Sequence, residues 1–333
     1  MAKTVLSAFN EFMKNEVNLD SDNTRKARVS RDWLVNQINM FPENNSDFPV
    51  IYEEKSIFFG SFARKTKKRP LDDIDIMIAL EAQNCTYSEF TDRIEINVPN
   101  NFSVFEKYCD KCSFKLNSIS LINEFKNNLQ DISQYSCAEI KRNQEAVTLQ
   151  MQSYDWNFDI VPCFITKVDE NNRNYYLIPD GKGNWKKTDP RIDRDRVTKI
   201  NSTKNGKILP VIRIIKYWNK RATMPSISSY LLENMILDYY EGSNEDVSEH
   251  IHIEVKKILS DLISRVYHYV NDPKNIQGDI NNLTMDEKNK LSYRADRDDK
   301  KAFEAIKHEN RGDMEKSIRQ WKEIFGISFP EYK

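Results

Sequence analysis

The stretch Leu71-Asp-Asp-Ile-Asp-Ile-Met-Ile-Ala-Leu80 places two carboxylates, Asp73 and Asp75, in an otherwise apolar run. Alternate side chains of an extended strand point the same way, so these carboxylates would lie side by side while isoleucines pack behind them. A later stretch, Trp156-Asn-Phe-Asp-Ile-Val-Pro-Cys163, adds Asp159. Charge in such runs is costly unless it has a partner. A pair of divalent cations about 3.5 to 4 Å apart is the partner that best suits three carboxylates, which indicates chemistry on phosphates.

A glycine and a serine, Gly60 and Ser61, end a short apolar stretch just before these acids. Glycine lets the backbone approach a ligand closely, and the exposed amides at the start of a helix favour phosphate oxygens. Ser61 can add a hydroxyl donor. The positively charged segment 64–69 follows, and eleven residues separate Ser61 from Asp73. The Gly-Ser pair is uninformative alone, but together with the three acids it indicates a phosphate-binding site.

This set of residues resembles the signature of the polymerase-beta-like nucleotidyltransferase superfamily. Within that superfamily, the chain looks like the bacterial cyclic-oligonucleotide synthases of anti-phage signalling, which are relatives of cyclic GMP-AMP synthase. The resemblance continues through Tyr176–Gly181, Arg213–Asn219, Ser228–Glu233 and Phe325–Pro330. It covers roughly the whole chain. It implies an α+β fold, in which a polymerase-beta-like lobe of mixed sheet and helices is joined to a helical lobe, with the active site in the cleft between them.

The resemblance also assigns nucleotide-binding roles. In related enzymes a lysine meets the triphosphate, a serine hydrogen-bonds a phosphate, and the tyrosine after it stacks on the base. These roles fall here on Lys216, Ser229 and Tyr230, although Ser228 is an alternative to Ser229. A point charge, a hydroxyl donor and an aromatic face suit the three roles. On its own, the stripe around Lys216 on the expected helix would indicate a solvated basic face.

The resemblance further implies that Asp73 and Asp75 bridge two Mg²⁺ or Mn²⁺ ions and that Asp159 completes the site. NTP substrates would be joined into a cyclic di- or trinucleotide with release of pyrophosphate, and a separate effector would recognise the product. A linear oligoadenylate-type polymerase and an enzyme that transfers NMP to a protein or small molecule remain as alternatives. A third alternative is a catalytically inactive scaffold, but the presence of all three acids argues against it. The sequence leaves base preference, ring size, linkage and trigger open.

Composition agrees with small, locally bound substrates. The chain has 333 residues, and 50 Lys and Arg nearly balance 51 Asp and Glu, so no global positive field marks a protein that coats nucleic acid. A mean hydropathy of -0.70 and the lack of a long apolar run or secretory signal predict a cytoplasmic protein that does not cross a membrane. Cys109 and Cys112 have the spacing of half a zinc site that nothing nearby completes. In the family that the chain resembles, the animal DNA sensor grips DNA with a zinc-bound insertion, and the sequence shows no equivalent, so the resemblance implies no DNA activator. We also expect a monomer.

Hydrophobic periodicity predicts a first half of helices and strands and a helical second half. We expect helices over 4–18, 30–41 and 117–133, and strands over 56–60, 73–80, 146–151 and 156–164, the last two as an antiparallel pair. Further helices are expected over 208–221, 228–241, 248–270 and 299–324. These patterns suggest a catalytic nucleotidyltransferase lobe over 1–190, with N-terminal helices that pack on the second lobe, and a helical nucleotide-binding lobe over 191–333.

Overall fold

The computed structural model describes residues 2–100, 103–111, 113–222, 224–225 and 227–333. The chain divides into two compact units, each of which is described by itself. Unit 1 contains Met1–Asp20, Arg64–Pro70 and Asp193–Lys333, and unit 2 contains Ser21–Ala63 and Leu71–Ile192. The predicted domains, 1–190 and 191–333, were contiguous in sequence, whereas both units are built from separate segments. Cys112, the second cysteine of the half zinc site, lies outside the described residues.

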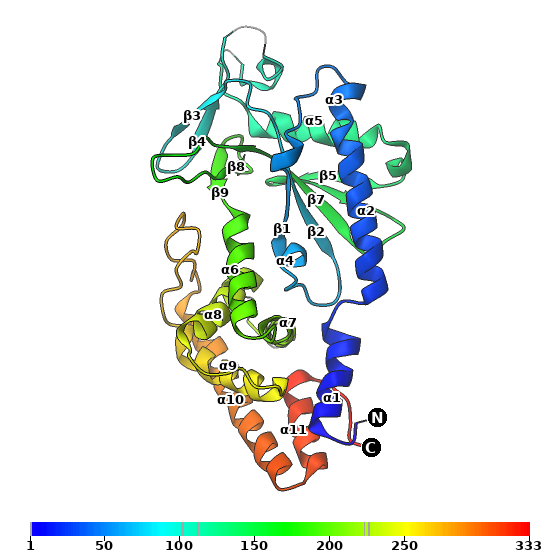
Figure 1. Ribbon diagram of the computed structural model, residues 1–333, viewed down its shortest axis with the longest axis vertical. Helices are drawn as coiled ribbons and strands as arrows, with labels where there is room; N and C mark the ends of the chain where they lie inside the picture. Colours follow the sequence, from blue (N-terminus) through cyan, green and yellow to red (C-terminus); the bar gives the residue numbers. More distant parts are fainter. Residues whose placement is uncertain (1, 101–102, 112, 223, 226) are drawn as a thin grey trace. The chain divides into compact units, whose positions relative to one another are not determined.

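Unit 1 is helical, and the apolar faces of its helices share one core. Figure 1 shows α10 and α11 running side by side within it. An α-helix and a π-helical turn form its N-terminal part, and α6, whose first residues belong to unit 2, leads into the rest. In chain order the elements are α1 (Val5–Phe12), the π-helical turn (Met13–Val17), α6 (Pro190–Thr203), α7 (Ile208–Asn219), α8 (Ser229–Gly242), α9 (Ile251–Arg265), α10 (Met285–Asn310) and α11 (Met314–Phe325).

Helix α1 is held in unit 1 by aromatic packing against the end of the chain. The Phe9 ring meets Trp321 edge-on at 5.0 Å and Phe329 at 5.1 Å between centroids. Phe12 lies 5.2 Å from Phe325. Such tilted and edge-on arrangements are the favoured geometries of aromatic pairs, and all of these rings are buried. The two ends of the chain are therefore close together in this unit (Figure 1).

Unit 2 contains a mixed nine-stranded sheet, within the described residues. The main path runs β1-β2-β7-β8-β9-β4-β3, and β6 joins β7 to β5 as a branch. Strand β2 pairs with β7 in parallel, and the other strand pairs are antiparallel. The strands are β1 (Ile57–Phe59), β2 (Asp73–Ala79), β3 (Thr86–Glu89), β4 (Ile94–Asn97), β5 (Glu139–Asn143), β6 (Ala146–Gln150), β7 (Asn157–Ile165), β8 (Tyr176–Pro179) and β9 (Trp185–Thr188).

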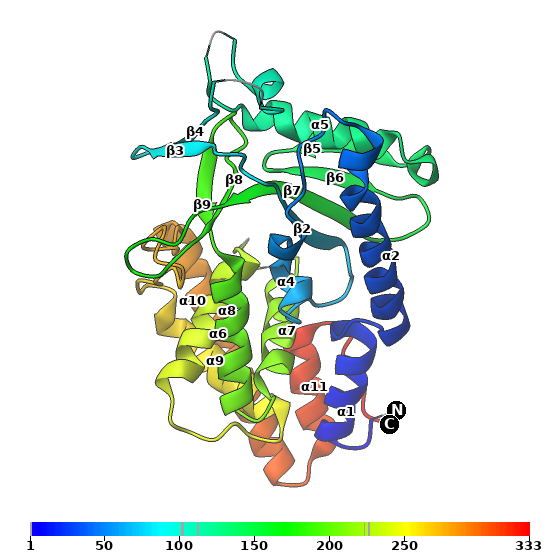
Figure 2. The same ribbon diagram turned by 45° about the horizontal axis from the view of Figure 1, so that its top comes forward.

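Helices cover this sheet. Helix α5 packs on β5, β6 and β7, and Figure 2 shows it lying along that part of the sheet. Its side chains Leu121 and Phe125 are fully buried, and Phe125 meets Phe48 at 5.0 Å between ring centroids. The helices of unit 2 are α2 (Ser21–Asn39), α3 (Phe41–Asn44), α4 (Gly60–Ala63) and α5 (Ser118–Gln130).

No helix in the described parts of the chain is both long enough and apolar enough to cross a membrane.

The predicted elements are right in type, but several bounds are wrong. Helix α2 begins nine residues before the predicted start at residue 30, because its first half is polar and lacks apolar periodicity. The helix predicted over 299–324 is two helices, α10 and α11, which are separated at Gly312 with a φ of 78°. Asp313 caps α11 by accepting from the Lys316 amide. The antiparallel pairing of β6 with β7 is confirmed. Helix α6 and strands β3, β4, β5, β8 and β9 were not predicted.

Candidate active site

Asp73 and Asp75 lie on the same face of β2. The intervening Ile74 and the following Ile76 are each 1% exposed, whereas both aspartates are half-buried. This alternation follows from the period of two in a strand. The strand therefore packs its isoleucines into the core and turns two carboxylates the other way, as expected.

The third predicted carboxylate, Asp159, lies on the neighbouring strand. In the parallel pairing of β2 with β7, Asp75 is the register partner of Asp159, and Asp73 that of Asn157. Register partners on adjacent strands lie about 4.8 Å apart and share a face of the sheet. Thr148 on β6, which sequence reasoning missed, donates from Oγ1 to Asp159 Oδ1 at 2.6 Å. The three predicted acids are thus brought to one face of two adjacent strands.

Gly60 is required where the chain turns from β1 into α4. Its φ is 70°, a left-handed conformation that costs other residues energy. A Cβ built on Gly60 would lie 1.7 Å from Oδ2 of Asp75, so no side chain fits there while that carboxylate keeps its place. Ser61 follows in the first turn of α4 and is half-buried. The Gly-Ser element is therefore fitted directly against one of the predicted catalytic acids.

The three acids suit a hard divalent cation by their chemistry, because carboxylate oxygens are the ligands that Mg²⁺ and Mn²⁺ prefer. Their side chains, however, do not converge. Asp75 is turned toward Gly60, and Asp159 accepts from Thr148. Across the described residues, no three His, Cys, Asp or Glu side chains are grouped closely enough to hold a metal ion. The backbone arrangement fits a metal site, but metal binding stays a prediction and would require the carboxylates to turn.

The predicted lysine of unit 1, Lys216, is bound to a buried carboxylate. Glu233 on α8 is 1% exposed, and its Oε2 lies 3.0 Å from Lys216 Nζ. Arg64 Nε donates to Glu233 Oε1 at 2.7 Å, and Thr66 Oγ1 donates to Oε2 at 2.8 Å. The short segment Arg64–Pro70 thus brings a guanidinium and a hydroxyl to the same acid as the lysine of α7. None of these partners was predicted.

Charges decide the protonation of this cluster. Burial acts to raise the pKa of Glu233, but Arg64 and Lys216 outweigh it and hold this pKa below its ordinary value. Burial lowers the pKa of Lys216, which Glu233 opposes. Two cations facing one ionised carboxylate leave an excess of positive charge. Lys216 and Arg213 therefore do not form the solvated basic face that was the alternative interpretation of α7, because Lys216 is 4% exposed and Arg213 donates to Asn18 and to the Lys65 carbonyl.

The predicted serine and tyrosine lie at the start of α8. Ser228 is the N-cap, and its Oγ accepts a hydrogen bond from the Tyr230 amide at 3.2 Å. Ser229 and Tyr230 are half-buried. The Tyr230 hydroxyl donates to Asp193 Oδ1 at 2.7 Å and accepts from Lys274 Nζ. Asp193 and Lys274 carry no local sequence signal and were not predicted.

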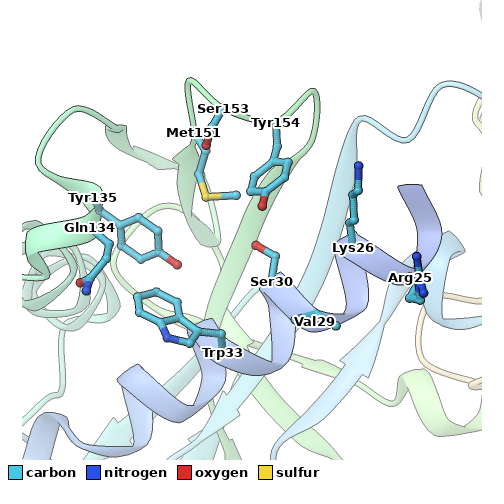
Figure 3. A pocket seen from close by; sticks show the side chains of 10 residues that line it. All are labelled: Arg25, Lys26, Val29, Ser30, Trp33, Gln134, Tyr135, Met151, Ser153 and Tyr154. Carbon is cyan, nitrogen blue, oxygen red and sulfur yellow. The ribbon is translucent and has the colours of Figure 1, made fainter. Parts of the chain in front are cut away.

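Unit 2 also has a cavity of about 610 Å³ between α2 and the loop that follows β6. Figure 3 shows Trp33 and Tyr135 on one side of this cavity, Tyr154 above it, and Arg25 and Lys26 at its other end. No predicted site residue lines it. The candidate active site is therefore defined by the carboxylates and their strand pairing, independently of this cavity.

No protein-family model matches the chain. A full-length relative is nevertheless clear. The chain is 44% identical over 334 residues to a protein of Bacillus cereus (strain VD146) that is described as a probable cyclic nucleotide synthase, and the match covers 100% of both chains.

Solved structures confirm the predicted fold class. CdnC of Escherichia coli MS115-1 with ATP has a TM-score of 0.69 at 16% identity, with 98% of each chain covered. The complex of the same protein with HORMA-deltaN has a TM-score of 0.68, and 98% of each chain is again covered. Escherichia coli DncV with 3'-deoxy GTP gives 0.65 at 13% identity, with 96% of this chain and 97% of that chain covered. Identities this low speak for the fold alone.

Gly60→Ala should displace the Asp75 carboxylate. We expect this variant to lose about 10²-fold in turnover, as a displacement of about 1 Å can cost, measured as pyrophosphate released from NTPs. Gly206→Ala is the matched control, because Gly206 has a φ of 78° and nothing within 4 Å of a built Cβ. Both variants carry backbone strain of about 1–2 kcal/mol. Equal activity in the two variants would show that Gly60 does not set the position of Asp75.

Glu233→Gln should destabilise unit 1 by about 3–5 kcal/mol at pH 7, because it leaves two buried cations without their counter-charge. Since the pKa of Glu233 is lowered in the folded protein, its stabilisation is present above the unfolded-state pKa and is lost as pH falls through the folded-state pKa. The free energy of unfolding, measured with urea, should therefore differ less between variant and wild type in acid than at pH 7. Glu241→Gln, which removes an exposed carboxylate from the same helix, should cost about 1 kcal/mol or less. A difference that grew in acid would contradict this account.

Proposed function

Because this chain belongs to the family of cyclic nucleotide synthases, we propose that it joins nucleoside triphosphates into a cyclic di- or trinucleotide and releases pyrophosphate. The chain is an enzyme, a nucleotidyltransferase. The observation that carries the proposal is the match at 44% identity over the full length of both chains. The role of the family in anti-phage defence supports a product that acts as a second messenger and switches on a separate effector.

Asp73, Asp75 and Asp159 are the proposed catalytic residues and the proposed ligands of two Mg²⁺ or Mn²⁺ ions. Their common face on two paired strands supports this assignment. Bound there, the ions would lower the pKa of the acceptor ribose hydroxyl and neutralise charge on the leaving pyrophosphate. The hydrogen bond from Thr148 occupies Asp159 Oδ1, so Oδ2 is the oxygen proposed to act as a ligand or as the base for that hydroxyl.

Gly60, Ser61, Lys216, Ser229 and Tyr230 are the proposed nucleotide-binding residues. The two residues at the start of α4 would offer a backbone amide and a hydroxyl to phosphate oxygens. Lys216 donates one of its three N–H groups to Glu233, and we propose that the other two donate to the triphosphate. The excess positive charge around Glu233 favours an anion there. Ser229 is proposed over Ser228 because the Ser228 oxygen caps α8.

The substrates and partners follow from the same family. The similar CdnC structures contain ATP in one case and a HORMA protein in the other, and the first supports NTP substrates for this chain. We propose that the protein acts as a monomer in the cytoplasm, where NTPs are available, and without a DNA activator. The net charge of -1 supports the last point, since no excess of basic residues is available to bind a polyanion.

Asp73→Asn and Asp75→Asn should abolish nucleotide incorporation while the protein stays folded, because the loss concerns charge at the proposed metal site. Asp72→Asn is the matched control, since Asp72 is exposed and precedes β2 on the other side-chain alternation. Pyrophosphate release and thermal unfolding should be measured on all three variants. Near-normal turnover in either Asp73→Asn or Asp75→Asn would rule out the assignment.

The product distinguishes a cyclic synthase from its alternatives. Purified protein with NTPs alone should give a labelled product that phosphatase does not degrade, because a ring has no terminal phosphomonoester. Mass spectrometry should show a whole number of nucleoside monophosphates less one water for each. Linear chains as the sole product would favour the oligoadenylate-type polymerase. Label found solely on an added protein or small molecule would favour NMP transfer.

A further inference from the structure

The Tyr230 hydroxyl, at the start of α8, is the middle of a chain of hydrogen bonds. Lys274 Nζ donates to its oxygen, and the hydroxyl in turn donates to Asp193 Oδ1 at 2.7 Å. An ammonium can donate and cannot accept, so the direction of this chain is fixed. A phenol oxygen with one donor and one acceptor partner has little freedom to rotate. The far end of the ring is therefore anchored by two hydrogen bonds.

Lys274 is itself held in place. Its side chain is 7% exposed, and its Nζ lies 2.9 Å from Asp272 Oδ1 and 3.5 Å from Asp193 Oδ2. Its three donors thus have three acceptors, namely two carboxylates and the Tyr230 oxygen. If the lysine served stability alone, the two buried carboxylates would be enough to compensate its charge. The third N–H group of Lys274 instead donates to Tyr230, whose ring is proposed to stack on a nucleobase.

The loop that carries Lys274 is closed around a single carboxylate. Asp272 is fully buried, and its Oδ2 accepts from the backbone amides of Ile276 and Gln277, each at 3.1 Å. Its Oδ1 accepts from the Lys274 amide at 3.2 Å. Because several hydrogen bonds hold this turn, the position of the Lys274 ammonium is restricted. Tyr230 and Lys274 are 44 positions apart in the sequence, so a distant loop sets the position of the ring.

We propose that Lys274 is a positioning residue for nucleotide binding, which orients the Tyr230 ring through its hydroxyl for stacking on the base. The inference rests on the proposed role of Tyr230 as the base-stacking residue. Nucleotide binding to a ring already fixed avoids the loss of side-chain freedom that ordering a mobile ring would require. Lys274 would therefore affect the affinity for the nucleotide without contacting the reacting atoms.

Tyr230→Phe removes the hydroxyl and keeps the ring, and Lys274→Met removes the ammonium and keeps the stem. We expect each to raise KM for NTP by about two- to tenfold, the effect of one immobilised side chain, and to lower kcat by less. The double variant should be no worse than the more affected single variant, since both changes break the same contact. Tyr240→Phe is the matched control, because Tyr240 on the same helix donates to buried Glu254 at 2.8 Å. It should lower the melting temperature and leave KM unchanged.

Three results would overturn the inference. These are an unchanged KM in Tyr230→Phe, a KM effect of Lys274→Met that persists in full when Phe replaces Tyr230, and an equal rise of KM in Tyr240→Phe. If Lys274→Met does not fold, Tyr230→Phe and its control decide the matter. Tyr230→Ala separates the two levels of the argument. If it leaves KM unchanged, the proposed stacking role fails; if it raises KM while Tyr230→Phe does not, stacking stands and only the inference about Lys274 falls.

Discussion

The parallel pairing of β2 with β7 is the constraint on which the candidate catalytic groups depend. A shift of this pairing by one residue would turn every side chain of one strand to the opposite face. Asp159 would then leave the side of Asp75, and Phe158 and Ile160, both fully buried, would be exposed. The free energy of burying those two side chains therefore keeps the carboxylates together. Core packing and the proposed chemistry share one register, so neither can change without the other.

In unit 1, buried carboxylates fix the positions of the charged nitrogens. Glu233 holds Lys216 and Arg64, and Asp272 holds Lys274. A free lysine on a surface would sample many rotamers, and ordering it on a ligand would cost entropy. A carboxylate buried beside it removes that freedom during folding. The groups proposed to meet phosphate and base are thus oriented before any nucleotide arrives.

The part of the site that follows local rules was predictable. The period of two put Asp73 and Asp75 on one face, and the motif spacing placed Gly60 before them. Side chains that act through long-range contacts were not predictable, because no local pattern says which cation a carboxylate will meet. Arg64 and Glu233 are 169 positions apart. Helix bounds failed where polar residues hide the periodicity, as in the first half of α2, and where a single glycine divides a continuous pattern, as between α10 and α11.

The chain passes between the two units four times, and two of these crossings enclose the segment Arg64–Pro70. This segment leaves unit 2 directly after the Gly-Ser element, supplies Arg64 and Thr66 to Glu233, and returns just before Asp73. A gene divided at residue 190 would consequently separate Met1–Asp20 and Arg64–Pro70 from the rest of unit 1. The C-terminal product would bury Glu233 with Lys216 alone, and it would lack the aromatic cover that Phe9 and Phe12 provide. Unit 1 therefore requires segments from both sides of residue 190, and a C-terminal fragment that begins there should not fold as unit 1 does in the whole chain.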